Sequence, residues 1–259
     1  MTTTGRAKVT APVPDGPAPP PAVQKLRLRY AKRGRLRFSS HRDFQRALER
    51  ALRRAAVPMA YSAGFTPHPK VSYANSAPTG TASEAEYVEL SVTQRCDPEA
   101  VRAALDSSLP PGLDVLAVVE ADAGSLADRL EASEWEVVLP GVTPAQARAA
   151  LEQLLAQDEV QVERLFKNGP RRFDARGAIV RAGVVDRVDP ADGGNCAILR
   201  MVVRHTTPAV RPDDVLAALR VVAHLVPPSP PQVTRLAQGP LSDAGTVTDP
   251  LATADVGGA

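Results

Sequence analysis

The sequence has few cysteines, few aromatic residues and no long apolar run. Only Cys96 and Cys196 are present, a hundred positions apart. A disulfide framework, a zinc ribbon and an intrinsic iron–sulfur cluster are therefore not expected. Aromatic residues make up 4% of the chain, so Leu, Val and Ala must fill the core. No leader-like pattern and no apolar run of about 18 residues occurs, which favours a cytoplasmic protein.

Familiar catalytic motifs are absent as well. The sequence contains no P-loop, no dinucleotide-binding fingerprint, no HExxH and no nucleophile elbow. This counts against an ordinary self-sufficient enzyme, although it does not exclude an unusual one. We expect the chain to bind no cofactor or metal of its own and not to be catalytic alone.

Positive charge is concentrated in one stretch. Residues 25–54 contain twelve Lys and Arg against only Asp43 and Glu49, whereas the whole chain has a formal net charge of +2. Such a density is typical of surfaces that attract polyanions. The simpler explanation is a solvated helix face with ordinary surface arginines.

The pattern of elements predicts an α+β protein with two tandem ferredoxin-like (β-α-β-β-α-β) domains. The expected boundaries are a disordered Pro-rich tail (1–24), a first domain (25–122), a polar joint, a second domain (133–238) and a second disordered tail (239–259). Strands are expected at 25–30, 71–74, 86–92, 113–119, 135–139, 160–165, 178–185, 196–204 and 233–237. Helices are expected at 41–56, after Asp97-Pro98, after Thr143-Pro144 and at 212–221.

The helix expected at 41–56 is the best-defined element. Ser40 and Asp43 match a capping box, and apolar residues from Phe44 to Ala55 recur at helical spacing, with most of the arginines off this stripe. The start of such a helix offers free amide groups to a phosphate or carboxylate. The loop at 62–70 follows, and its one Gly and two Pro predict a fixed shape.

These features define the candidate binding residues. They comprise the basic strand and helix, the helix start, the loop and two acidic residues before the strand at 86–92: Arg27, Arg29, Arg35, Arg37, Ser39, Ser40, His41, Arg42, Arg46, Arg50, Gly64, Phe65, His68, Lys70, Glu84 and Glu86. The two histidines of this set could instead act as general base and acid in metal-independent RNA cleavage. The two acidic residues could equally be the charged entry to a strand.

Three blocks in this order resemble the radical-SAM-linked proteins, a bacterial family that occurs as a separate chain or fused behind a radical SAM enzyme with a cobalamin-binding-like region. The blocks are Phe38-Ser39-Ser40-His41-Arg42-Asp43, then Tyr61-Ser62-x-Gly64-Phe65-x-Pro67-His68-Pro69-Lys70, then Ser83-Glu84-x-Glu86-Tyr87. Thr66 departs from the Asn that is common in the family. The resemblance covers about residues 25–238 and is strongest in the first half.

The resemblance implies a radical SAM enzyme as partner. S-adenosylmethionine and an iron–sulfur cluster would then be bound by that partner and not by this chain. We therefore expect an accessory protein that holds RNA or another phosphate-bearing substrate. The alternatives are an RNA-processing endonuclease that uses His41 and His68, and a subunit that binds only protein.

Overall fold

The computed structural model describes residues 19–185 and 196–252. Most of the predicted N-terminal tail (1–18) and the end of the predicted C-terminal tail (253–259) lie outside the described residues. The first half of the chain contains β1 (Gln24–Lys32), the 3-10 helix η1 (Gly34–Phe38), α1 (His41–Arg54), β2 (Val71–Ala74), β3 (Ala82–Val92), α2 (Pro98–Ser108) and β4 (Val115–Glu120).

The second half repeats much of this order and adds a hairpin. It contains the 3-10 helix η2 (Ala127–Arg129), β5 (Ala132–Pro140), α3 (Pro144–Leu155), β6 (Gln161–Phe166), β7 (Gly169–Asp174), β8 (Ile179–Val185), β9 (Cys196–Arg204), α4 (Pro212–Ala223) and β10 (Gln232–Gly239). Each half therefore contributes two α-helices and one group of strands to the α+β fold.

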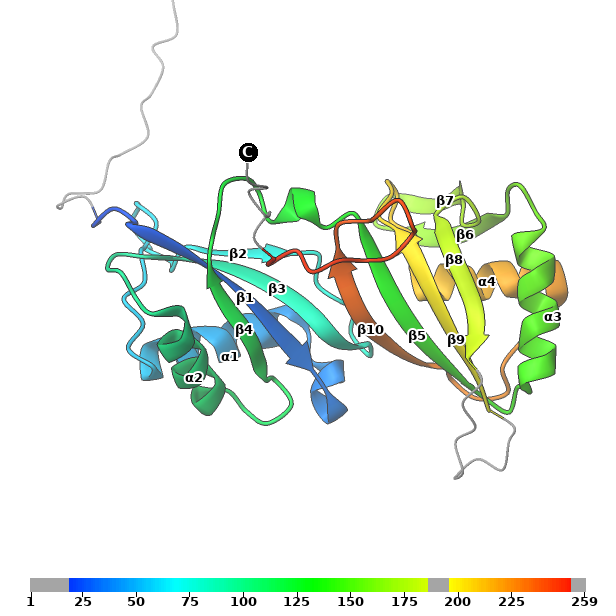
Figure 1. The fold of residues 1–259 in the computed structure, drawn as a ribbon, viewed down its shortest axis with the longest axis horizontal. Helices are drawn as coiled ribbons and strands as arrows, with labels where there is room; N and C mark the ends of the chain where they lie inside the picture. Colours follow the sequence, from blue (N-terminus) through cyan, green and yellow to red (C-terminus); the bar gives the residue numbers. More distant parts are fainter. Residues whose placement is uncertain (1–18, 186–195, 253–259) are drawn as a thin grey trace, which may run out of the picture.

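One mixed sheet runs through both halves. Its strand order is β4-β1-β3-β10-β5-β9-β8, and β2 also pairs with β3. The outer edge of β3 has two partners, because its residues 87–90 pair with β2 and its residues 82–83 pair in parallel with β10. Figure 1 shows β3 and β10 meeting in the middle of the molecule. The halves, predicted as tandem domains, are thus joined by backbone hydrogen bonds.

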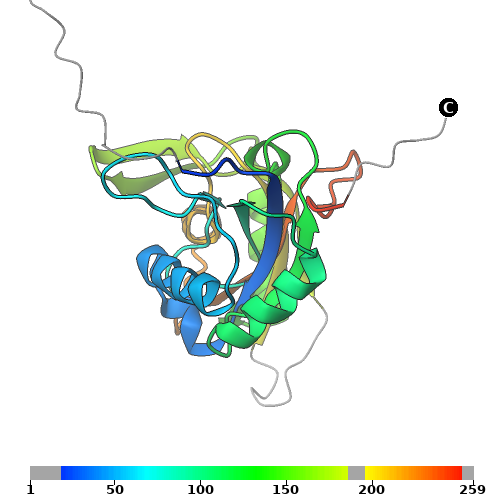
Figure 2. The same ribbon diagram turned by 90° about the vertical axis from the view of Figure 1, so that its left-hand side faces the viewer.

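The helices cover one face of this sheet. In the first half, apolar side chains of α1 and α2 pack on β1, β3 and β4, and Figure 2 shows the two helices next to β1. In the second half, α3 and α4 pack on β5, β8 and β9 around a larger core. On the opposite face of the first half, Tyr87 packs with Leu126, Leu130 and Leu251.

The start of α1 confirms the predicted capping box. The Asp43 amide donates to Ser40 Oγ over 3.2 Å, and the Ser40 amide donates to Asp43 Oδ2 over 3.1 Å. The apolar stripe of the helix is buried through Phe44, Leu48 and Leu52. Because both the cap and the stripe are local in sequence, this element could be predicted closely.

Two segments differ from the expectation. The expected order has no strand between 160–165 and 178–185, whereas β7 lies there and pairs with β6 as a separate two-stranded hairpin outside the main sheet. Residues 240–252, predicted to be disordered, form a turn held by a bridge between Leu241 and Val247. Leu251 closes the segment with only 7% exposure. Its side chain fills a gap on the sheet face that composition alone does not reveal.

No helix in the described part of the chain is both long enough and apolar enough to cross a membrane.

Candidate functional site

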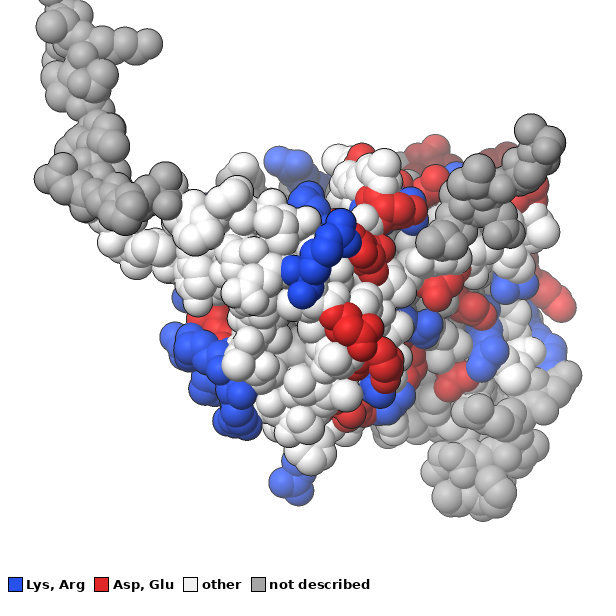
Figure 3. Space-filling model, turned by 60° about the vertical axis from the view of Figure 1, so that its left-hand side comes forward, with Lys and Arg blue, Asp and Glu red and all other residues white. Residues whose placement is uncertain are grey.

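A row of arginines lies on the exposed face of α1. Arg42, Arg46 and Arg50 follow one another at four-residue spacing, opposite the buried Phe44 and Leu48. Figure 3 shows basic side chains gathered at the edge of the molecule formed by α1. Other basic side chains on the same face of the molecule lie beside acidic ones. We call the row, with the further exposed residues at the ends of the helix, the α1 basic face: Arg35, Arg42, Arg46, Arg50, Arg53 and Arg54.

The predicted strand contribution to this surface is wrong for Arg27. Its side chain is 1% exposed and forms ion pairs with Glu89, at 3.1 Å, and with Asp122. Arg27 faces the side of the sheet that α1 does not cover, where the loop after β4 closes over it. A nucleic acid cannot reach a charge in this position.

Other basic residues near β1 also have ion-pair, hydrogen-bond or ring partners. The Lys25 ammonium lies 3.1 Å from Glu89, and the Arg33 guanidinium lies between Glu84 and Asp114. Arg29, half-buried, donates to the Glu84 carbonyl over 2.8 Å. The half-buried Arg37 lies over the ring of Phe38 at 4.8 Å from its centroid. The charge count of residues 25–54 therefore overstates the free charge, which is concentrated on α1.

The residues at the start of α1 have local hydrogen-bond partners. Ser40 and Asp43 are engaged in the capping box, and these hydrogen bonds lower the pKa of the Asp43 carboxyl. His41 is exposed; its Nε2 lies 3.0 Å from the Gln45 amide nitrogen and its Nδ1 lies 3.3 Å from Ser76 Oγ. Ser39 is half-buried at the end of η1. Ser40 thus has a structural role here.

The loop expected at 62–70 is closed at its base by hydrogen bonds between residues 62 and 68. The Ser62 amide donates to the His68 carbonyl over 2.8 Å, and the His68 amide donates to Ser62 Oγ over 3.0 Å. Gly64 has a φ of +137°, and Phe65 beside it is 71% exposed. The Lys70 side chain is exposed just beyond the loop.

The structure does not bring His41 and His68 together. His41 is the first residue of α1, whereas His68 lines a hollow of about 170 Å³ with Glu49, Leu52 and Arg53 near the other end of the helix. Eight or more helical residues separate the two places, which is a rise of about 12 Å or more. General acid–base catalysis needs both groups within hydrogen-bond reach of one substrate atom or of one intervening water.

Glu86 lies in the interior and not on a binding surface. Its carboxylate is 3.1 Å from the guanidinium of Arg235 on β10, and the two side chains are 2% and 5% exposed. Arg235 also donates to the Asn75 carbonyl over 2.7 Å and lies over the Trp135 ring at 4.7 Å. Burial lowers the pKa of Arg235, and the charge of Glu86 opposes this shift. The pair ties β3 of the first half to the second half.

His205 is a half-buried polar residue at the same junction, and no pattern in the sequence singles it out. Its Nε2 lies 2.8 Å from Ser133 Oγ, and its Nδ1 lies 2.6 Å from the Leu130 carbonyl and 2.9 Å from the Asn75 amide nitrogen. Burial lowers the pKa of the imidazole. Arg235 could have been noticed as a charge between Val233 and Ala237 on an expected strand. The pairing of Arg235 with Glu86 could not have been predicted from the sequence.

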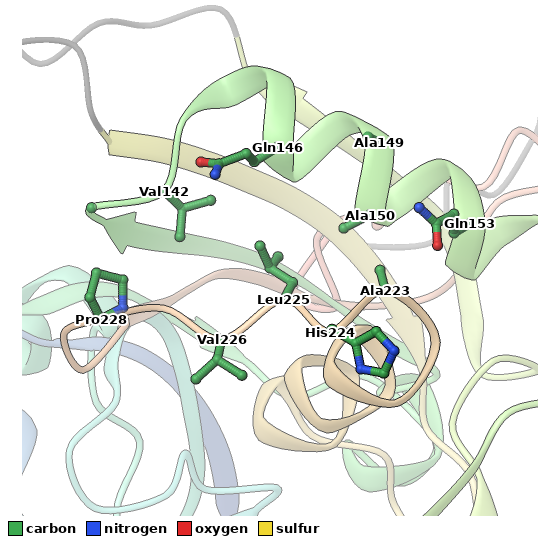
Figure 4. Close-up of a pocket in the computed structure, with 11 residues that line it drawn as sticks. Val142, Gln146, Ala149, Ala150, Gln153, Ala223, His224, Leu225, Val226 and Pro228 are labelled. Atoms are coloured by element: carbon green, nitrogen blue, oxygen red, sulfur yellow. The ribbon is translucent and has the colours of Figure 1, made fainter.

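A cavity of about 350 Å³ lies between α3 and the segment that follows α4. Figure 4 shows Gln146 and Gln153 on α3, with Leu225 and His224 on the opposing segment. None of the residues selected from the sequence lines it. The candidate residues are instead grouped along α1.

The fold and this surface define a mixed α+β protein with one exposed basic helix and a buried ion pair between its halves. The chain belongs to a family described as uncharacterized proteins conserved in bacteria, DUF2344, whose model matches residues 25–212. The match runs from β1 to the first residue of α4. The comparison with curated proteins gives no match.

Proposed function

We propose that this protein is an accessory subunit that binds RNA through the α1 basic face and presents it to a radical SAM enzyme. The observation that carries the RNA-binding part is the exposed row Arg42, Arg46 and Arg50, none of which forms an ion pair with an acidic side chain of residues 19–185 or 196–252. Successive members are about 6 Å apart along the helix axis. Guanidinium groups suit phosphate because they donate two parallel hydrogen bonds.

The proposed partner is supported by the resemblance of the three sequence blocks to the radical-SAM-linked proteins. In this proposal the partner carries S-adenosylmethionine and the iron–sulfur cluster. The complex works in the cytoplasm, where RNA is made and modified. We further propose that each half is a ferredoxin-like unit, which the strand orders β4-β1-β3-β2 and β10-β5-β9-β8 support.

The first prediction concerns charge on α1. A variant with Arg42, Arg46 and Arg50 replaced by Gln should bind a labelled RNA about tenfold or more weakly, since hydrogen bonds to charged groups contribute about 1.5–3 kcal/mol each. Loss of three phosphate contacts should also lower the slope of log affinity against log salt by about two. Fluorescence anisotropy over a salt series measures both.

The matched control removes the same charge elsewhere. Lys167, Arg171 and Arg172 are exposed on the β6–β7 hairpin of the second half, and their replacement by Gln should leave the affinity and the salt slope unchanged. Equal losses in both variants would mean that RNA responds to net charge alone, and the assignment to α1 would be rejected.

The partner is tested separately by tagging the protein in its own host and identifying what co-purifies, with and without RNase. The proposal predicts a radical SAM protein together with defined RNA that is lost on RNase treatment. RNA that is shortened at fixed sites would favour the endonuclease alternative. A radical SAM protein that co-purifies without RNA, combined with no RNA binding in the anisotropy assay, would favour the protein-binding alternative.

A further inference from the structure

The exposed aromatic side chains are concentrated around α1. The chain has five Phe, four Tyr and one Trp, all of them in the described ranges. Of these only Phe38, Tyr61 and Phe65 are exposed, at 59%, 40% and 71%. Phe38 lies just before the start of α1, and Tyr61 lines the hollow with Leu52 and Arg53 of the same helix. Single exposed apolar residues are common, but three exposed aromatic rings on the segments that precede and follow one basic helix call for an explanation.

The backbone holds Phe65 away from the core. Phe65 is at the tip of the loop whose base is closed by the two hydrogen bonds between Ser62 and His68. The strand-like bridge between Tyr61 and Pro69 fixes the direction of the loop. A pinned base with an exposed ring at the tip is unfavourable for an isolated protein and useful for contact with a flat apolar partner.

Phe38 is presented in a similar way at the other end of the helix. The Ser39 amide donates to the Leu36 carbonyl over 2.9 Å, and the Gly80 amide donates to the Arg37 carbonyl over 2.8 Å. The Arg37 guanidinium lies over one side of the Phe38 ring, and the ring is still mostly open to solvent. A planar π-system could therefore stack on it.

We infer that the RNA bound by this protein is single-stranded and that its bases stack on Phe38 and Phe65 while its phosphates contact the arginines of α1. This inference rests on the proposed function and specifies its substrate. A basic groove with interleaved aromatic side chains is the common arrangement for binding single strands, because each base has a face that can stack. Bases in a duplex are stacked on one another and cannot reach these rings.

The test uses three labelled probes: a single-stranded RNA of about a dozen nucleotides, an abasic strand with the same number of phosphates, and the same RNA strand paired with its complement. Wild type should bind the single strand more tightly than the other two. Phe38→Ala and Phe65→Ala should each weaken single-strand binding about 5- to 100-fold. Both variants should bind the abasic strand and the duplex as wild type does, with unchanged salt slopes.

Two further variants make the result specific. Leu165→Ala removes the most exposed large apolar side chain, at 79%, from the distant β6–β7 hairpin, and it should change nothing. Phe65→Trp should retain the affinity, because a larger ring can still stack.

The outcomes separate the two proposals. Wild-type protein that binds no probe at low salt overturns both RNA binding and stacking. Binding that depends on the α1 arginines but is unaffected by Phe38→Ala and Phe65→Ala overturns stacking alone. Stacking alone is also overturned if the wild type binds the duplex more tightly than the single strand, or if Phe38→Ala and Phe65→Ala weaken binding of the abasic strand as much as binding of the single strand.

Discussion

Replacing Glu86 by Leu should strongly destabilise the folded protein. Glu86 and Arg235 are 2% and 5% exposed, and the ion pair crosses from β3 to β10. Removing one partner leaves the other charge buried and uncompensated, which costs about 3–5 kcal/mol. The Arg235 Nε has no hydrogen-bond partner within the described structure, so the guanidinium depends all the more on Glu86.

The neighbouring Glu84 provides a matched control on the same strand. Glu84 pairs with Arg33, but the two side chains are 30% and 46% exposed. Exposed ion pairs contribute about 0–1 kcal/mol, so Glu84→Leu should cost much less than Glu86→Leu. Urea titrations followed by circular dichroism give the free energy of unfolding of both variants. The comparison holds when the m-values of the variants equal that of the wild type.

A double-mutant cycle sharpens the test. Arg235→Met alone should also cost about 3–5 kcal/mol, because it leaves the Glu86 carboxylate buried. The double variant Glu86→Leu, Arg235→Met should be less destabilised than either single variant, because neither member of the pair is left buried without the other. If Glu86→Leu costs no more than Glu84→Leu, or if the two single effects simply add, the reasoning is refuted.

Two more predictions concern the half-buried His205 and the buried Leu251. His205 has a lowered pKa in the folded state, so the unfolded state takes up the proton first as pH falls below about 6.5. Stability should therefore decrease between pH 7.5 and 5.5 in urea titrations, and it should decrease by less in His205→Gln. An identical pH dependence in His205→Gln would contradict this. Leu251→Ala should cost about 2 kcal/mol or more in the same assay, and a cost near zero would mean that the C-terminal segment does not contribute to the core.

The features that the sequence predicted depend on residues that are close together in the chain. The start of α1 could be read from Ser40 and Asp43, and the course of the helix from the spacing of its apolar residues, because helix capping and helical periodicity involve neighbours within one or two turns. A loop around Phe65 was expected from its glycine and prolines, whereas the hydrogen bonds that close its base were not. These features account for the part of the candidate site that lies along α1.

Long-range pairing could not be predicted in this way. Counting charge along residues 25–54 treats every arginine as exposed, yet Arg27 is paired with residues 62 and 95 positions away. Glu86 meets Arg235 over 149 positions. Whether a charged residue on a strand faces solvent or a partner depends on which strands become neighbours, and the sharing of one edge of β3 between β2 and β10 has no local signal.

The turn at 75–80 contacts both the start of α1 and the buried ion pair between the halves. Ser76 contacts His41 at the start of α1, and the Ala77 amide donates to Glu86 over 2.9 Å. The Asn75 carbonyl accepts from Arg235, so the same turn contacts the second half. Two of the three sequence blocks, 38–43 and 83–87, therefore converge on one short turn, and the third, 61–70, leads through β2 into it. The turn therefore connects the start of α1 with the buried ion pair between the halves.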